Sequence, residues 1–149
     1  MDLRSGGAVV ALVVVLTGCS LSGRSEQKAE QQARNDAETI TIQSELAKVP
    51  GVVDVKVLYS NYITEPGAGS ANLIVEHGTD LERIADLTVG VVWRSQLDPL
   101  KSIRVGVLED KDRTVGVVRS YSIFDDKAEL EAKYGPRPVG AVTRGTGRG

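Results

Sequence analysis

Few side chains in this sequence could perform chemistry, and the single histidine is the first to consider. His77 stands close to Glu76 and Asp80, and an imidazole with two carboxylates could bind a cation. However, the chain has no second histidine, and no cysteine stands near His77 at the spacing that metal ligands need. The three residues also lie where a strand is expected to turn into a helix. We therefore interpret His77 as a solvated turn residue and predict no metal site.

The serines and the paired acids give equally little support for catalysis. Serines such as Ser44, Ser70 and Ser95 do not stand in a sequence that resembles a nucleophile elbow. Asp110 and Asp112 flank a lysine in a short charged turn, whereas a calcium loop needs more oxygen ligands at ordered spacing. We predict a protein that is not an enzyme and has no cofactor. Carboxylates brought together by folding are the alternative that the sequence leaves open.

The only cysteine, Cys19, directly follows a short apolar run near the N-terminus. The run from Ala8 to Leu16 is too short to cross a hydrocarbon core of about 30 Å as a stable helix. The residues Leu16-Thr17-Gly18-Cys19 resemble the lipobox of bacterial lipoproteins. That resemblance implies that residues 1–18 are a signal peptide, that the Cys19 thiol carries a diacylglycerol, and that the new N-terminus is often acylated. It also implies a lipid-anchored protein of the cell membrane or cell envelope, outside the cytoplasm.

A retained membrane anchor with an unmodified thiol is the alternative interpretation of the N-terminus. Asp2 offsets part of the charge of Arg4, so the basic region ahead of the apolar run is thin. The charge of the whole chain is close to balanced, at −2. This balance argues against a nucleic-acid partner, because nucleic-acid binding needs a strongly basic surface.

Composition divides the chain into four parts, of which the signal peptide, residues 1–18, is the first. After the signal peptide, residues 19–36 contain one large apolar side chain and are expected to form a polar tether, whose later part could extend the next helix. Residues 37–124 are expected to form the folded domain. Residues 125–149 are expected to form a short helix over 126–134, with Ala128, Leu130 and Tyr134 as its apolar contacts, and a disordered tail.

Within the domain, hydrophobic spacing predicts an α+β fold with the order helix, strand, strand, helix, strand, strand. The first helix should start at Ala37 and stop at Pro50-Gly51. The first strand should bury alternate residues of the run 52–59, and these are Val53, Val55, Val57 and Tyr59. Further strands are expected around 71–75, 103–107 and 115–117. The predicted sheet has about four strands, antiparallel or mixed, with two helices packed on one face.

The second predicted helix begins at Thr79-Asp80-Leu81-Glu82, which has the form of a capping box, and ends before Pro99. Trp93 falls beside its apolar stripe, either at the edge of the core or in contact with a partner. The loop from Asn61 to Gly69 is long and carries two large apolar side chains, Tyr62 and Ile63. These two side chains either fold back over the sheet or face a partner or a lipid surface. Tyr62, Ile63 and Trp93 are therefore the candidate partner-binding residues.

Residues 44–110 are similar to the ring-building domain of type III secretion lipoproteins and of the flagellar basal-body ring protein. The similarity depends on the Pro50-Gly51-Val52 turn and on the apolar spacing of the segments that follow it. It implies an α+β module that assembles with copies of itself or with other proteins. The chain has room for one such domain and lacks a second membrane helix, which departs from that family.

Two functions follow from these observations. The leading prediction is a lipid-anchored envelope protein that acts, without catalysis, as an interaction or assembly module. Its expected partners are the membrane, through Cys19, and an envelope protein or a second copy. The alternative is a small ligand-binding lipoprotein with a pocket between the sheet and its helices. A filled core with exposed strand edges would favour the first, and a roomy apolar cavity would favour the second.

Overall fold

The computed structural model describes residues 22–138, which form an α+β fold with a four-stranded mixed sheet and three helices. The signal peptide, Cys19 and the tail 139–149 lie outside the described residues. The elements are α1 (Ser22–Leu46), β1 (Val52–Ser60), β2 (Ala68–Val75), α2 (Leu81–Trp93), β3 (Ser102–Glu109), β4 (Gly116–Ser122) and α3 (Lys127–Tyr134). The α+β class and the sheet of four strands are as predicted.

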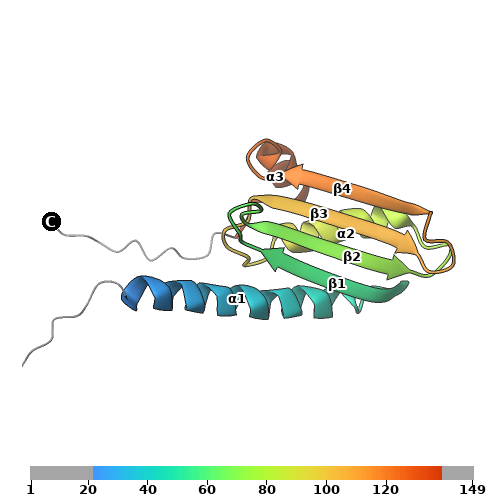
Figure 1. The fold of residues 1–149 in the computed structure, drawn as a ribbon. Helices are drawn as coiled ribbons and strands as arrows, with labels where there is room; N and C mark the ends of the chain where they lie inside the picture. Colours follow the sequence, from blue (N-terminus) through green and yellow to red (C-terminus); the bar gives the residue numbers. More distant parts are fainter. Residues whose placement is uncertain (1–21, 139–149) are drawn as a thin grey trace, which may run out of the picture.

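The sheet has the order β1-β2-β3-β4, so β1 and β4 are its edges. β1 pairs antiparallel with β2, β2 pairs parallel with β3, and β3 pairs antiparallel with β4. The parallel pair needs a crossover connection, and α2 provides it. α1 and α2 pack on the same face of the sheet, and in Figure 1 α2 lies behind the strands while α1 runs along β1.

The core lies between these helices and one face of the sheet. Trp93, Leu73 and Val92 are buried there with the inward side chains of β3, which are Ile103, Val105 and Val107. In β1, Val55 and Val57 are buried and Lys56 between them is exposed, as the alternation predicts. The prediction that Val53 is buried is wrong, because its side chain is exposed. A bulge between Val52 and Asp54 inserts one residue into β1, and this turns Val53 out of the core.

The first helix begins well before the predicted start at Ala37. α1 starts at Ser22, so residues 22–36 of the predicted tether are helical. Part of this extension packs on the domain, because Asn35 is buried and exchanges two hydrogen bonds with the backbone of Asp98. Gln31 also donates to the Asp98 carbonyl. The polar character of these contacts explains why no apolar stripe marks them.

The second and third helices also differ from the prediction in detail. Asp80, not Thr79, caps α2, because its carboxylate accepts from the backbone N–H of Arg83 at 3.0 Å. α3 packs on the core through Leu130, whereas Ala128 is exposed. The Trp93 indole N–H donates to the carbonyl of Gly135 at 2.8 Å. The packed domain therefore extends past residue 124 and includes α3.

Candidate interaction surface

The structure separates the predicted partner-binding residues. Tyr62 and Ile63 lie in the loop between β1 and β2, where their side chains are 73 % and 101 % exposed. Trp93 is 1 % exposed, so the prediction that it contacts a partner is wrong. The Trp93 ring is buried in the core, and its indole N–H is bonded to the carbonyl of Gly135. The side chain therefore leaves no surface for a partner to contact.

His77 does not meet Glu76 and Asp80 as the hypothetical cation site requires. Its Nδ1 lies 2.7 Å from Oε2 of Glu109, at the end of β3, and its backbone N–H donates to the carboxylate of Asp110. The Glu109 side chain is 11 % exposed, and the imidazole is 65 % exposed. The pair therefore covers a mostly buried carboxylate with an exposed ring. Among residues 22–138, no three His, Cys, Asp or Glu side chains are grouped as a metal site would need.

The second face of the sheet is covered by no helix or strand of the described residues, as Figure 1 shows. We call it the open face. Parallel strands such as β2 and β3 are usually covered on both sides. The open face carries apolar side chains from all four strands, which are Leu58, Ile74, Leu108 and Val118. Val118 is 66 % exposed. The open face is thus suited to contact rather than only to solvation.

Polar side chains divide the apolar ones on the open face. Arg104 stands between Ser70 and Ser120 in one row across the strands, and Lys56 stands beside Asn72 in the next. A hollow of about 450 Å³ lies over this region, lined by Leu58, Ser70, Arg104 and Ser120 among others. Neither Lys56 nor Arg104 has an ion-pair partner within residues 22–138. A partner with acidic and apolar groups would complement this surface.

Strand β4 has an unpaired outer edge next to the open face. The bonds from Glu109 N–H to the Val115 carbonyl and from Ile123 N–H to the Lys101 carbonyl fix which residues of β4 bond to β3. Residues 116, 118, 120 and 122 fall between these bonded positions, so their backbone N–H and C=O groups point away from the sheet. Edge groups of this kind are a template for another strand.

The outer edge of β4 is blocked at its C-terminal end but open in its middle. The carboxylate of Asp126 accepts from Ser122 N–H at 2.8 Å, and Asp126 N–H donates to the Ser122 carbonyl. The carbonyl of Val118 accepts from the Arg119 guanidinium. No group of the described chain is bonded to the N–H of Val118 or to the N–H and C=O of Ser120. The middle of β4 is therefore able to pair with a further strand.

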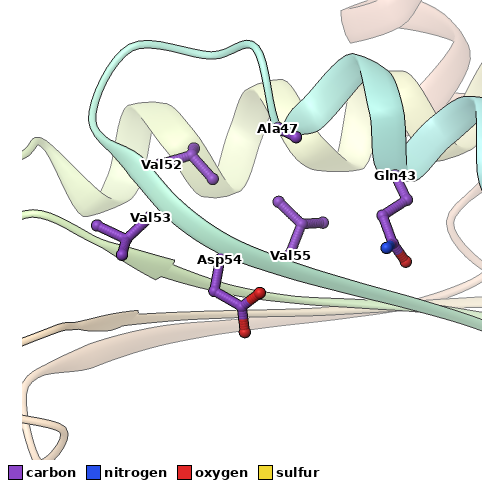
Figure 2. A pocket seen from close by; sticks show the side chains of 6 residues that line it. All are labelled: Gln43, Ala47, Val52, Val53, Asp54 and Val55. Atoms are coloured by element: carbon purple, nitrogen blue, oxygen red, sulfur yellow. The ribbon is translucent and has the colours of Figure 1, made fainter.

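The other edge strand, β1, is protected by α1. The side-chain carbonyl of Gln43 accepts from the N–H of Val57 at 3.3 Å. Beside this contact lies a small hollow of about 170 Å³, shown in Figure 2, between Gln43 of α1, Ala47 just after the helix, and the start of β1. The carboxylate of Asp54 points away from the helix in this view. The unprotected edge of the sheet is thus β4.

Polar side chains from β1 and from the C-terminal segment hold the chain between α2 and β3. The Tyr59 hydroxyl donates to the Pro99 carbonyl at 2.7 Å, and the Arg137 guanidinium donates to the carbonyl of Leu97. Burial raises the pKa of Tyr59, and the nearby charge of Asp98 adds to this effect. Burial lowers the pKa of Arg137, although Asp98 and Tyr59 oppose the change. These contacts fix the segment from Leu97 to Pro99, and they have a structural role.

Sequence reasoning missed Val118, Ser120 and Phe124. Val118 and Ser120 occur in a strand whose outer edge is defined only by the pairing of β3 with β4. Phe124 follows β4 in a turn and is 94 % exposed. A large aromatic residue in a turn was a signal that the sequence did contain.

Comparisons with protein-family models, with curated proteins and with solved structures found no match to this chain. In addition, no helix among residues 22–138 has the length and hydrophobicity to cross a membrane.

Proposed function

We propose that this protein is a lipid-anchored, non-enzymatic interaction module of the cell envelope, held at the membrane by Cys19. The open face and the outer edge of β4 are its partner-binding surface. The observation that carries the proposal is the unpaired N–H of Val118 and the unpaired N–H and C=O of Ser120, beside the exposed side chain of Val118. An added strand would satisfy these backbone groups, and its own outward side chains would extend the open face.

Two kinds of partner fit this surface. A strand from another envelope protein could pair with β4, or β4 could pair with the same strand of a second copy. The resemblance of residues 44–110 to ring-building domains supports an assembly of like modules. For a strand from another envelope protein, the unpaired cation of Arg104 on β3 favours acidic side chains near the new strand, whereas Lys56 lies on the opposite edge strand, β1.

The ligand-binding alternative receives less support from the geometry. The hollow between α1 and β1 in Figure 2 measures about 170 Å³, which is below the range of about 300–1,000 Å³ that is common for small-molecule pockets. Large side chains fill the space between the sheet and α2, including Trp93, Leu97 and Ile84. Both observations favour contact through the surface.

Site-specific crosslinking in intact cells tests this proposal. A photoreactive amino acid at position 118 should crosslink to a partner or to a second copy. The matched control is position 40, because Ile40 lies on α1 and is 68 % exposed, close to the 66 % of Val118. A discrete product at position 118 and none at position 40 is expected. Equal products at both positions, or none at position 118, would contradict the proposed surface.

A further inference from the structure

The outer edge of β4 carries both hydrogen-bond donors and acceptors in a short stretch. Within the described chain, no group bonds to the N–H of Gly116 or of Val118, or to the N–H and C=O of Ser120. The Val118 carbonyl accepts from the neighbouring Arg119 guanidinium at 3.3 Å, and a carbonyl can accept a second bond because it has two lone pairs. Antiparallel strands bond through alternate residues that each give one N–H and one C=O. The edge from 116 to 120 can therefore pair with an identical edge.

The register centred on Val118 brings open backbone groups together. It sets Val118 opposite its copy and Gly116 opposite Ser120, so each bonding position meets another that is open. A register centred on Ser120 instead sets Val118 opposite Ser122, and a register centred one residue before Val118 sets Ser120 opposite Thr114. The N–H groups of Ser122 and Thr114 are already bonded to aspartate side chains. Both alternatives would therefore leave free groups of the edge unpaired.

The charge of the edge favours the same register. Arg119 is the only charged side chain from position 115 to position 121, and its guanidinium is paired with Glu82 of α2. A register centred on Arg119 would place two guanidinium groups directly opposite each other, and like charges in that position are destabilising. The register centred on Val118 places Arg119 opposite Val117 instead. An edge whose one charge is already paired suits a neutral strand, and β4 of a second copy is such a strand.

This register also joins apolar side chains that stand apart in one copy. Val118, which is 66 % exposed, would lie against Val118 of the second copy. Leu108 extends the apolar area to the edge, because its side chain occupies the place that a Cβ at Gly116 would need. On the other face of the sheet, Val115 is 42 % exposed and falls opposite Tyr121 of the second copy. Aromatic and β-branched side chains stabilise a strand pair when they lie opposite each other.

We propose that β4 pairs antiparallel with β4 of a second copy, about a two-fold axis at Val118. The two sheets then form one continuous sheet, and their open faces lie side by side on the same side of it. Figure 1 shows no helix or strand of residues 22–138 beside the middle of this edge. The proposal rests on the proposed function, because it names a second copy as the partner of the β4 edge.

Disulfide trapping of the full chain in intact cells tests this register. Bonded residues of an antiparallel pair have Cα atoms about 5.5 Å apart, and a disulfide joins Cα atoms about 4.4–6.8 Å apart. Val118→Cys should therefore give a disulfide-linked dimer under mild oxidation. Val118 is exposed, so this substitution should leave the domain folded.

Three controls accompany Val118→Cys. Ser120→Cys lies on the same edge, but the two copies of position 120 would stand four residues apart, or about 13 Å along the strand at about 3.3 Å for each residue. Ile40→Cys on α1 is 68 % exposed and measures chance collisions. The unsubstituted chain measures any disulfide formed through Cys19, its only cysteine. We expect a dimer from Val118→Cys and none from the three controls.

A second substitution shows whether backbone pairing brings the two cysteines together. In the Val118→Cys chain, Ser120→Pro removes the N–H that would donate to the Gly116 carbonyl of the second copy, and the disulfide should be lost. Ser120→Ala keeps this N–H and should keep the disulfide. A disulfide that persists with proline at position 120 would overturn the strand pairing.

The remaining outcomes separate this proposal from the proposed function. A dimer from Arg119→Cys but not from Val118→Cys would overturn the register and the proposal with it. No disulfide from Val118→Cys, together with a photo-crosslink from position 118 to a different protein, would overturn the second copy as the partner and leave the proposed function intact. Neither a disulfide nor a photo-crosslink at position 118 would overturn both.

Discussion

The side-chain carbonyl of Gln43 accepts the backbone N–H of Val57 at 3.3 Å, and this contact protects one edge of the sheet. The opposite edge has only partial protection, from Asp126 at its C-terminal end. Natural sheets avoid uncontrolled pairing by covering their edges. The difference between β1 and β4 therefore gives the molecule one direction in which its sheet can grow.

Proline at position 120 should block this growth without unfolding the domain. The N–H of Ser120 points away from β3, so Ser120→Pro removes an outward donor and leaves the ladder between β3 and β4 intact. We expect the free energy of unfolding, measured by chemical denaturation, to change by no more than about 1 kcal/mol. The crosslink at position 118 should disappear.

Arg119→Pro and Ser120→Ala are the controls for this variant. The N–H of Arg119 faces β3, so proline there should destabilise the domain by about 1–3 kcal/mol, since a ladder bond is lost and its partner is left unsatisfied. Ser120→Ala keeps the backbone N–H and should retain the crosslink. Loss of the crosslink in Ser120→Ala would show that the hydroxyl, not the edge, binds the partner.

A carboxylate at position 57 should disrupt the core, because the Val57 side chain is buried in the cluster between the sheet and its helices. Val57→Asp buries an unpaired charge and should cost about 3 kcal/mol or more of unfolding free energy. Lys56→Ala, on the exposed face of the same strand, should change it by less than about 0.5 kcal/mol. Thermal and urea denaturation measure both. A large loss from Lys56→Ala with none from Val57→Asp would contradict the register.

Alternation of apolar side chains was sufficient to predict the central strands, but it could not reveal the bulge in β1. Val53 belongs to the alternating series with Val55 and Val57 in sequence, and only the pairing with β2 shows the extra residue. The early start of α1 was hidden for a related reason. Its contacts with the domain are amide hydrogen bonds from Gln31 and Asn35, and polar side chains give no hydrophobic period.

The candidate surface could be predicted only in part. Tyr62 and Ile63, which lie in the loop between β1 and β2 and outside this surface, were identifiable as exposed because large apolar side chains are unusual in a loop rich in turn residues. The pairing of His77 with Glu109 spans 32 positions, and the outer edge of β4 depends on strand order. Both are properties of the assembled sheet, so no local pattern in the sequence reports them.

The cap of α2 gives a direct test of the corrected helix start. Asp80→Ala removes the carboxylate that accepts from Arg83 N–H and should destabilise the domain by about 1 kcal/mol. Thr79→Ala should have the smaller effect, because Thr79 is not the cap. Urea denaturation of the two variants distinguishes them. A larger loss from Thr79→Ala would favour the capping box that the sequence predicted.

Replacement of Cys19 by serine should abolish lipid attachment, because the serine hydroxyl cannot form the thioether. Metabolic labelling with a radioactive fatty acid measures attachment, and fractionation after a high-salt wash measures membrane association. The unmodified chain and Cys19→Ser should be compared at equal expression. Labelled Cys19→Ser protein that stays with the membrane would contradict the anchor.

The partly buried Tyr59 hydroxyl should make stability depend on alkaline pH. Its pKa is raised above the ordinary value of 10.0 by burial, so the folded state holds this proton more tightly than the unfolded state. By linkage, its contribution is fully present below pH 10 and is lost as the pH rises through the higher folded pKa. At pH 8, Tyr59→Phe should lose about 1 kcal/mol with the hydrogen bond to Pro99. Above pH 10 the difference from the unmodified chain should narrow, and urea titrations at both pH values measure it. A difference that widens there would show that the ionised hydroxyl is favoured in the folded state, contrary to its burial.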